Sequence, residues 1–370
     1  MKNNLRICCL ISLLVILLLF PEPIIMATKT GLLTWTDKVI PTLFPFFVLT
    51  NLMIYYGIPQ LMGKMLSPLF KHFLHLSPII FFIILMSLIS GNPSGAKIAR
   101  QYYDQKVISK REFQGLLYFC NFSSPLFIIG TIGVLLYQST KIGYFLLASH
   151  LLGSFIVFIC CYYPYFKTNS KLSTVEISTP IEPFSAILIN AIENSIQTLI
   201  RVGGIIMVFY IVSAAFNTLQ LFDVLNHLLA PLLSLTNIGN IEPLFSGLLE
   251  FTQGVTKVVN TNLPFHIQLA LIAFIISFAG FSVHTQIFMF VKDEIVSYFK
   301  YFTYRLMHGW ASTLFVLFSW RYVFKDVQDV LYPLEGVEPT VSFLLPSISI
   351  GIIGFYFILK LLKFSYYLKN

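Results

Sequence analysis

The chain has 370 residues, of which 56% are hydrophobic and only 11% are charged. An average soluble domain is about 25% charged, and a mean hydropathy of +0.80 means more apolar surface than a soluble fold can bury. These figures exclude a soluble enzyme, a disordered regulator and a secreted disulfide scaffold. The net charge of +8 comes from Lys and Arg residues scattered between apolar runs, which is typical of membrane orientation rather than nucleic-acid binding. We therefore predict an all-α polytopic membrane protein in a lipid bilayer, without a nucleic-acid partner.

Apolar stretches long enough to cross a bilayer, for which a helix needs about 20 residues, recur along the chain. We predict about eight transmembrane helices, at 5–27, 39–57, 113–137, 142–163, 199–217, 265–291, 306–324 and 341–362. The first has a basic start, but Pro21, Glu22 and Pro23 occupy the place of a signal-peptidase site. This pattern favours a retained signal anchor over a cleaved signal peptide.

The distribution of Lys and Arg predicts the orientation of these helices, because positive residues stay on the cytoplasmic side. Both termini and the segments 57–112 and 292–305 are basic and should be cytoplasmic. In contrast, the stretch 202–291 contains Lys257 as its one Lys or Arg, and the link 325–340 is acidic. The loops of these two segments should therefore be external.

Two apolar regions are too short or too interrupted to cross. The first, 78–90, runs into the sequence SGNPSGAK at 90–97, where glycine and proline break a helix. The second, 242–260, is interrupted by polar residues and glycines. Because about 10–14 apolar residues are typical of re-entrant segments, we predict a re-entrant helical hairpin in each region.

Each hairpin has the same neighbours in the sequence. An amphipathic stretch, at 60–75 and at 221–235, precedes it and should lie flat in the membrane interface. A span with a break follows it, and the breaks fall at 121–125 and at 279–284. The order of flat helix, hairpin and broken span thus occurs twice.

The spacing within these two units indicates an internal repeat. Gly95 and Gly254 are 159 residues apart, and so are Phe122 and Phe281 (254 − 95 and 281 − 122). The charge pattern predicts that the first hairpin enters from the cytoplasm and the second from outside, so the repeats are inverted. Inverted repeats with broken helices are the architecture of secondary transporters, whose substrate site lies near the bilayer midplane.

This organisation divides the chain into five parts. They are a signal-anchor helix with an external link (1–38), a first repeat with a cytoplasmic-side hairpin (39–163), a cytoplasmic linker (164–183), a second, inverted repeat with an external-side hairpin (184–305), and two C-terminal transmembrane helices (306–370). The predicted fold is thus about eight crossings plus two hairpins in an inverted repeat.

Polar and ionisable side chains at membrane depth are costly and are candidates for function. Those at the hairpin tips and helix breaks are expected to bind substrate: Asn92, Ser94, Gly95, Lys97, Asn121, Ser123, Ser124, Glu250, Thr252, Gln253, Gly254, Lys257, Ser282 and His284. Backbone N–H groups at the two tips, near Gly95 and Gly254, would favour an anionic group of the substrate.

A purely structural interpretation of these residues stays open. Lys97 and Lys257 would then extend to the interface, with Glu250 paired to one of them. The polar residues at the breaks would satisfy the backbone of interrupted helices.

No motif indicates a catalytic group, a metal site or a cofactor. His72 and His75 are three residues apart, but no third ligand is near them in the sequence. The cysteines lie in apolar segments, and the phosphate-binding motif of ATPases is absent. We therefore expect neither enzymatic activity nor a cofactor or metal.

Three short motifs resemble a known family. The sequences GLLTW at 31–35 and VIPTLFPFF at 39–47 resemble the start of YlbJ-type sporulation integral membrane proteins. SGNPSGAK at 90–97 is similar to the first-hairpin motif of this family, and EFTQG at 250–254 to the second. The family carries the nucleoside recognition (Gate) domain and is distantly similar to concentrative nucleoside transporters.

The resemblance implies a transporter-like protein of an endospore-forming bacterium, located in the cell membrane or the outer forespore membrane. The implied cargo is dipicolinate, a small aromatic dianion. Our leading hypothesis is secondary transport or facilitation of such an anion by alternating access, while a coupling ion and a homo-oligomer stay open. One alternative is a non-transporting sporulation protein that uses a degenerate domain for sensing or recruitment. The other is a nucleoside transporter, although the base- and ribose-binding motifs of those proteins are not evident here.

Overall fold

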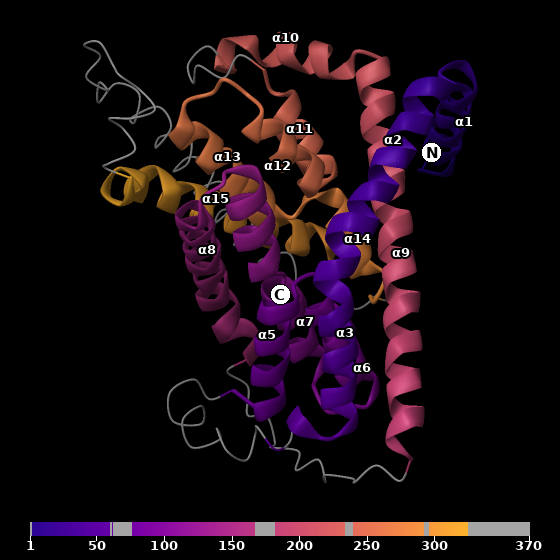
Figure 1. The fold of residues 1–370 in the computed structure, drawn as a ribbon, viewed down its shortest axis with the longest axis vertical. Coiled ribbons are helices and arrows are strands. Elements are labelled where there is room, and N and C mark those ends of the chain that lie inside the picture. The colour runs from indigo at the N-terminus through magenta and orange to yellow at the C-terminus, as the bar shows by residue number, and fades with distance from the viewer. Residues whose placement is uncertain are drawn as a thin grey trace.

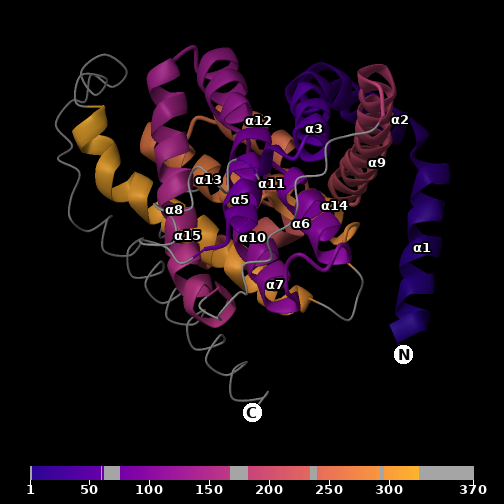
Figure 2. The ribbon, with the colours of Figure 1, turned by 90° about the horizontal axis from the view of Figure 1, so that it is seen from below.

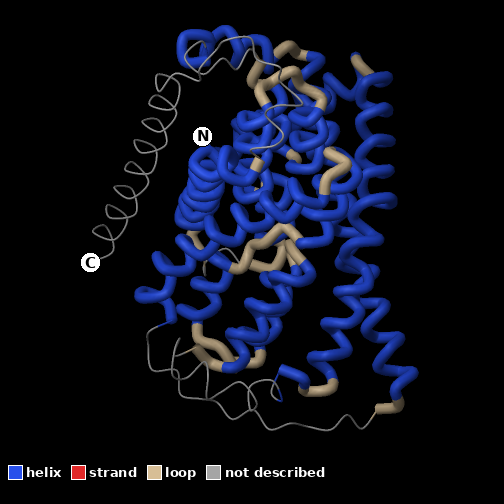
Figure 3. The backbone as a smooth tube through the Cα atoms, turned by 60° about the vertical axis from the view of Figure 1, so that its left-hand side comes forward, coloured by secondary structure: helices blue, strands red, loops and turns tan. Residues whose placement is uncertain are grey.

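The computed structural model describes residues 2–59, 61, 76–166, 182–233, 240–291 and 296–324. Within these ranges the chain forms helices joined by loops and turns, and no strand (Figure 3). The elements are α1 (Lys2–Leu19), α2 (Pro21–Thr34), η1 (Trp35–Val39), α3 (Ile40–Tyr55), α5 (Pro78–Ser90), α6 (Ser94–Asp104), α7 (Lys110–Phe119), η2 (Leu126–Leu136), α8 (Thr140–Phe166), α9 (Phe184–Thr218), α10 (Leu221–Leu233), α11 (Glu242–Leu249), α12 (Phe251–Val259), α13 (Phe265–Phe278), α14 (Gly280–Phe288) and α15 (Tyr298–Val323). The helical class predicted from composition is confirmed.

Several of these helices have the length and composition of membrane spans. Within the described residues four qualify, namely Pro21–Tyr55, Thr140–Cys161, Phe184–Thr218 and Phe265–Phe288. Shorter apolar helices cover Leu10–Leu19, Pro78–Ser90 and Leu126–Leu136. The helical membrane class is thus supported, whereas the number of eight crossings stays a prediction.

The helices differ from the predicted spans near the N-terminus. The span expected at 5–27 is divided at Phe20, because Pro21 begins a new helix at a position that proline favours. From there α2, η1 and α3 run on as one apolar rod to Tyr55, so the expected external link is helical. The predictions for 60–75 (apart from Leu61) and 341–362 lie outside the described residues.

The first hairpin consists of α5 and α6. Ser77 caps α5 by accepting the N–H of Ile80, and the helix ends at Ser90, as the sequence predicts. Gly91 then adopts a left-handed φ of 76°, which a side chain would disfavour, and the chain turns back into α6.

The span that follows this hairpin is interrupted where expected. α7 ends at Phe119, residues 120–124 have no helical structure, and η2 begins at Leu126. Pro125 explains the break, because it lacks an N–H group and disfavours the helical conformation of Ser124. The four residues before this proline, 121–124, are nevertheless buried, so irregular backbone lies in the protein interior.

The helices α10 to α14 fall where the second repeat is predicted. α10 runs almost perpendicular to α9 across one end of the molecule (Figure 1). α11 and α12 form the hairpin, and α13 and α14 form the broken span. The break is a left-handed turn, with a φ of 74° at Ala279 and of 65° at Gly280.

The two hairpins lie toward opposite ends of the long axis. Figure 1 shows α5 and α6 in the lower half and α11 and α12 in the upper half, while α9 runs almost the full height. Seen along that axis in Figure 2, the hairpins lie between a group of α2, α3 and α9 and a group of α8 and α15. α1 stands apart from this body, and its exposed side chains, such as Leu10 (67% exposed) and Leu18 (72%), suit a lipid environment.

Candidate functional site

A small cavity lies where the two units meet. Its volume is about 50 Å³, which is room for a few water molecules. The walls come from both hairpins, both broken spans, η1, α3 and α9: Val39, Thr42, Leu43, Gly91, Asn92, Ser123, Ser124, Phe127, Val202, Ile206, Phe251, Thr252, Val283 and Gln286. The structure thus brings four of the predicted site residues together, namely Asn92, Ser123, Ser124 and Thr252.

In the first unit, the hairpin turn is bonded directly to the helix break. The N–H of Asn92 donates to the carbonyl of Phe122 at 2.8 Å, and the hydroxyl of Ser87 donates to the carbonyl of Cys120 at 2.7 Å. Gly95 makes this approach feasible, because a Cβ there would lie 2.7 Å from the carbonyl oxygen of Cys120. Gly95 therefore permits the close contact of the turn with the break, and neither Gly95 nor Ser94 lines the cavity.

In the second unit, glycines play the equivalent part. A Cβ on Gly254 would lie 2.5 Å from the backbone nitrogen of Gly247, so these residues let α11 and α12 touch. A Cβ on Gly280 would lie 2.9 Å from the carbonyl oxygen of Gly247, so the second break also packs against its hairpin. The two glycines separated by 159 residues, Gly95 and Gly254, thus share one role: each permits close packing of a hairpin.

Glu250 occupies the N-terminus of α12 itself. Its Oε2 accepts the N–H of Gln253 at 2.9 Å and the hydroxyl of Thr252, while the N–H of Gly254 bonds to the Glu250 carbonyl. Our expectation that the N–H groups of Gln253 and Gly254 are free to bind an anion is therefore wrong. The carboxylate of Glu250 already satisfies this helix end.

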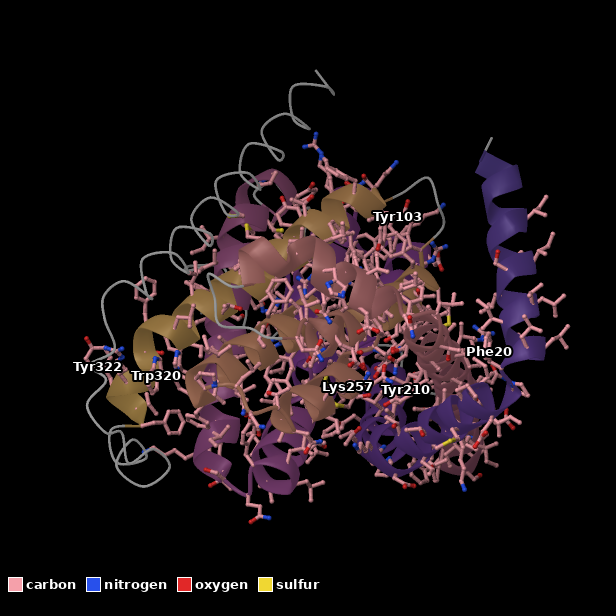
Figure 4. The ribbon with its side chains drawn as sticks, turned by 90° about the horizontal axis from the view of Figure 1, so that it is seen from above. Phe20, Tyr103, Tyr210, Lys257, Trp320 and Tyr322 are labelled. Atoms are coloured by element: carbon pink, nitrogen blue, oxygen red, sulfur yellow. The ribbon has the colours of Figure 1, made fainter. Side chains whose placement is uncertain are left out.

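The two lysines of the hairpins bind protein groups outside the cavity. Lys97 donates from Nζ to the hydroxyl of Thr198 at 2.9 Å and to the carbonyl of Asn194 at 3.3 Å, both in α9. Lys257, which lies near the middle of the bundle in Figure 4, forms an ion pair with Glu242 at 2.6 Å. Glu250 pairs with neither lysine among the described salt bridges, contrary to the structural alternative raised above.

The remaining candidates are buried but do not line the cavity. The side-chain amide of Asn121 donates to a backbone carbonyl one turn earlier in α7. Ser282 is fully buried, and its hydroxyl has no hydrogen-bond partner among the described residues. Both ring nitrogens of His284 are engaged, one with the carbonyl of Phe278 and the other with the hydroxyl of Tyr298.

A buried cation beside the first break was not predicted as a site residue. Arg305 is 0% exposed in α15, although the charge pattern had placed it in a cytoplasmic loop. Its guanidinium donates to the carbonyl of Tyr118 at 2.8 Å, to the carbonyl of Asn121 at 3.0 Å and to Nδ1 of His308 at 3.1 Å. It thus satisfies free carbonyls at the C-terminus of α7, where a positive charge is favourable.

Two buried histidines connect this cation to the cavity wall. His308 donates from Nε2 to the carbonyl of His150 at 2.8 Å, and Nε2 of His150 accepts the N–H of Ser123 at 3.1 Å. Because Nε2 accepts, the proton of His150 lies on Nδ1, which bonds to the hydroxyl of Ser277 at 2.9 Å. Ser277 in turn donates to Ser312 at 2.9 Å. This network fixes the irregular segment 120–124 to α8, α13 and α15.

Signals for some of the missed residues exist in the sequence. His150 lies in the middle of a predicted span, and His308 is close to the start of another, positions where ionisable groups are rare. Gln286 follows Ser282 by one helical turn, so it shares the face of α14 on which a candidate already stood. Thr42 of α3 carries no such signal.

The cavity wall combines a few hydrogen-bonding side chains with a mainly apolar surface. The polar residues of the wall are Thr42, Asn92, Ser123, Ser124, Thr252 and Gln286, and most of the other wall residues are apolar, a composition typical of a ligand site. The described residues contain no cluster of three metal-ligating side chains.

These features define a helical integral membrane protein in which two helical hairpins and two interrupted helices surround a small, mainly apolar cavity with a few polar side chains. The chain is 30% identical over 328 residues to the sporulation integral membrane protein YlbJ of Bacillus subtilis strain 168, an alignment that covers 84% of this chain and 80% of that protein. It therefore belongs to the YlbJ family of sporulation integral membrane proteins, which confirms the resemblance of the three motifs. No family model matches the chain, and no solved structure matches it.

Proposed function

We propose that the protein carries a small organic anion, with dipicolinate as the first candidate, across a membrane of the sporulating cell. The mechanism is secondary transport or facilitation by alternating access rather than enzymatic conversion. One observation carries the proposal: hairpin and break residues of both units, which are far apart in the sequence, line a single cavity. Transporters with inverted repeats bind substrate at such a meeting point of broken helices.

The arrangement of the hairpins favours access from two sides. α9 has 35 residues and is therefore about 52 Å long, enough to cross a bilayer with a margin. Because α9 follows the long axis, that axis is the natural membrane normal, and the hairpins then enter from opposite faces (Figure 1). The charge pattern assigns the first hairpin to the cytoplasmic face. It also assigns the N-terminus to that face, but Figure 1 shows the N-terminus in the upper half of the molecule, with the second hairpin.

The volume of the cavity fits a closed state of such a carrier. About 50 Å³ is too small for an aromatic dianion, so binding requires one hairpin to move away from its break. The wall includes the turn of the first hairpin, at Gly91 and Asn92, and the irregular residues Ser123 and Ser124 of the first break, so a movement of this hairpin would open the cavity.

The electrostatics near the cavity favour an anion. Arg305 is fully buried and forms no salt bridge among the described residues, so its charge is offset by neutral partners, namely two carbonyls and Nδ1 of His308. A buried cation without a carboxylate partner attracts anions, and in a low-dielectric interior this attraction is strong. The guanidinium of Arg305 donates to the carbonyl of Asn121, and Asn121 precedes the cavity residue Ser123 by two positions.

The proposal is tested by uptake of radiolabelled dipicolinate into liposomes that contain the purified protein. We expect uptake by the wild type and a loss of at least severalfold in Thr252→Val, which removes a cavity hydroxyl. Thr285→Val, at an exposed position of the neighbouring α14, is the matched control and should transport normally. Uptake of uridine but not dipicolinate would favour a nucleoside carrier, and uptake of neither would favour a role in sensing or recruitment.

A further inference from the structure

Glu250 is a buried acid with only one of its two oxygens satisfied. The residue is 0% exposed, and its Oε2 accepts two hydrogen bonds, from the hydroxyl of Thr252 and the N–H of Gln253. Its Oε1 is buried and has no hydrogen-bond partner among the described residues. A bare carboxylate oxygen in such a place is costly, so the structure leaves a vacant binding position at Oε1.

A chain of hydroxyl groups fixes the other oxygen. The single proton of the Thr252 hydroxyl is used on Glu250, so Thr252 can only accept from the hydroxyl of Tyr210, 3.4 Å away. Tyr210 then accepts from the hydroxyl of Thr34 at 3.0 Å. The two donors to Oε2 thus come from α12, and hydroxyl groups of α9 and α2 orient the Thr252 hydroxyl, while Oε1 has no partner among the described residues.

No charged neighbour occupies this position. Lys38 of η1 is the cation with an electrostatic influence on Glu250, but the two form no ion pair. Of the titratable groups on the adjacent helices, Lys257 pairs with Glu242, and His284 of α14 bonds to a backbone carbonyl. His266 of α13 stacks on Trp320, Asp223 and His227 of α10 form no described salt bridge, and η2 has no titratable side chain.

The cavity next to Glu250 creates a physical link between this acid and the cargo. Thr252 lines the cavity and also bonds to the carboxylate, so an anion in the cavity would lie close to the charge of Glu250. Two negative charges at this separation repel strongly in a low-dielectric interior. A proton on Oε1 removes the repulsion without disturbing either bond to Oε2. Anion and proton therefore favour each other's binding, which is thermodynamic coupling between two sites.

We propose that Oε1 of Glu250 binds a proton that crosses the membrane together with the anionic cargo, so that the carrier is a proton–anion symporter. The inference rests on the transport function proposed above and identifies its coupling ion. The proton comes from water on the side where the anion binds and is released to water on the other side. No covalent bond other than the O–H bond forms or breaks.

The test uses purified full-length protein in liposomes, with dipicolinate as the probe, and two assays. In the exchange assay both sides hold dipicolinate at equal pH. In the accumulation assay the outside is one pH unit more acidic, and valinomycin with potassium holds the membrane potential at zero. One proton per dianion then predicts about tenfold accumulation. We expect wild type and the control Glu193→Gln, at an exposed position of α9, to perform both reactions. Glu250→Gln should exchange but not accumulate.

The outcomes separate the two proposals. Tenfold accumulation by Glu250→Gln would overturn the proton site and leave dipicolinate transport intact. Absence of exchange and accumulation in the wild type would remove the transport function itself, and the symport with it. If Glu250→Gln is inactive in both assays, infrared difference spectra decide. A carboxylic acid band that appears in the wild type with dipicolinate and is missing in the variant supports the proton site, and its absence from the wild type overturns it.

Discussion

Gly254 is the position where one added methyl group should damage the second hairpin most. A Cβ there would overlap the Cα of Gly247 and lie 2.5 Å from its nitrogen, with the carbonyl oxygen of Pro243 at 3.1 Å. These are backbone atoms, which cannot move away by a change of rotamer. Gly254→Ala must therefore push α11 away from α12.

The size of this effect follows from two opposing terms. Alanine is favoured over glycine in a helix by about 1 kcal/mol, whereas overpacking costs about 1–3 kcal/mol and more where the backbone must shift. A clash with backbone atoms should cost about 3 kcal/mol, the upper end of the overpacking range. The helix preference of alanine offsets about 1 kcal/mol of this cost, so we expect a net loss of about 2 kcal/mol. Gly204→Ala in α9 is the matched control, since a Cβ there meets nothing within 4 Å. This control should gain up to about 1 kcal/mol.

The assay is thermal unfolding in detergent, followed with a thiol-reactive fluorescent dye. Cys120 and Cys161 are buried free cysteines, so their reaction with the dye reports loss of the fold. The midpoint should fall for Gly254→Ala and should stay equal or rise for Gly204→Ala. Equal midpoints in the two variants would refute the close packing of α11 and α12.

Two further predictions concern the polar interior. Arg305→Met should leave the carbonyls of Tyr118 and Asn121 without this donor, which costs about 1–3 kcal/mol each. The unfolding midpoint should therefore fall, whereas Arg111→Met, at an exposed position, should leave the midpoint unchanged. Tyr210→Phe should remove the hydroxyl that links Thr34 to Thr252 and Glu250, and should reduce proton-driven dipicolinate accumulation severalfold in the accumulation assay. The control Tyr144→Phe, at an exposed position, should leave accumulation unchanged. An unchanged midpoint in the first case, or normal accumulation in the second, would contradict the roles assigned to these residues.

Local chemistry in the sequence was sufficient to predict the interruptions of the helices. Pro125, the glycine–proline turn after Ser90 and the polar start of α12 each break a helix for a reason that acts over a few residues. For the same reason the end of α5 at Ser90 agrees with the prediction. The junction of α2 and α3 was missed, because η1 contains a Lys and an Asp that resemble a loop, yet it continues the helix.

The contacts between distant residues could not be predicted, because they depend on how helices pack. The pattern of charges treated Arg305 as a mark of the cytoplasmic side, while the structure buries it against carbonyls of α7. Likewise the structural interpretation paired Glu250 with Lys97 or Lys257, but the packing of α11 against α12 brings Lys257 to Glu242. The sequence pattern located the hairpins and the breaks, whereas the hydrogen bonds and ion pairs between their side chains depend on how the helices pack.

The central claim is that the cavity between the hairpins is the path of the anion. It is tested most directly by one cysteine, Ser124→Cys, in a protein whose five native cysteines are replaced. Membrane vesicles are treated with a membrane-impermeant thiol reagent from either side, with Ser185→Cys at an exposed position of α9 as control. Our account predicts that Ser124→Cys reacts from both sides and is protected by dipicolinate, while the control reacts from one side without protection. Reaction of Ser124→Cys from one side only, at a rate that dipicolinate does not change, would contradict it.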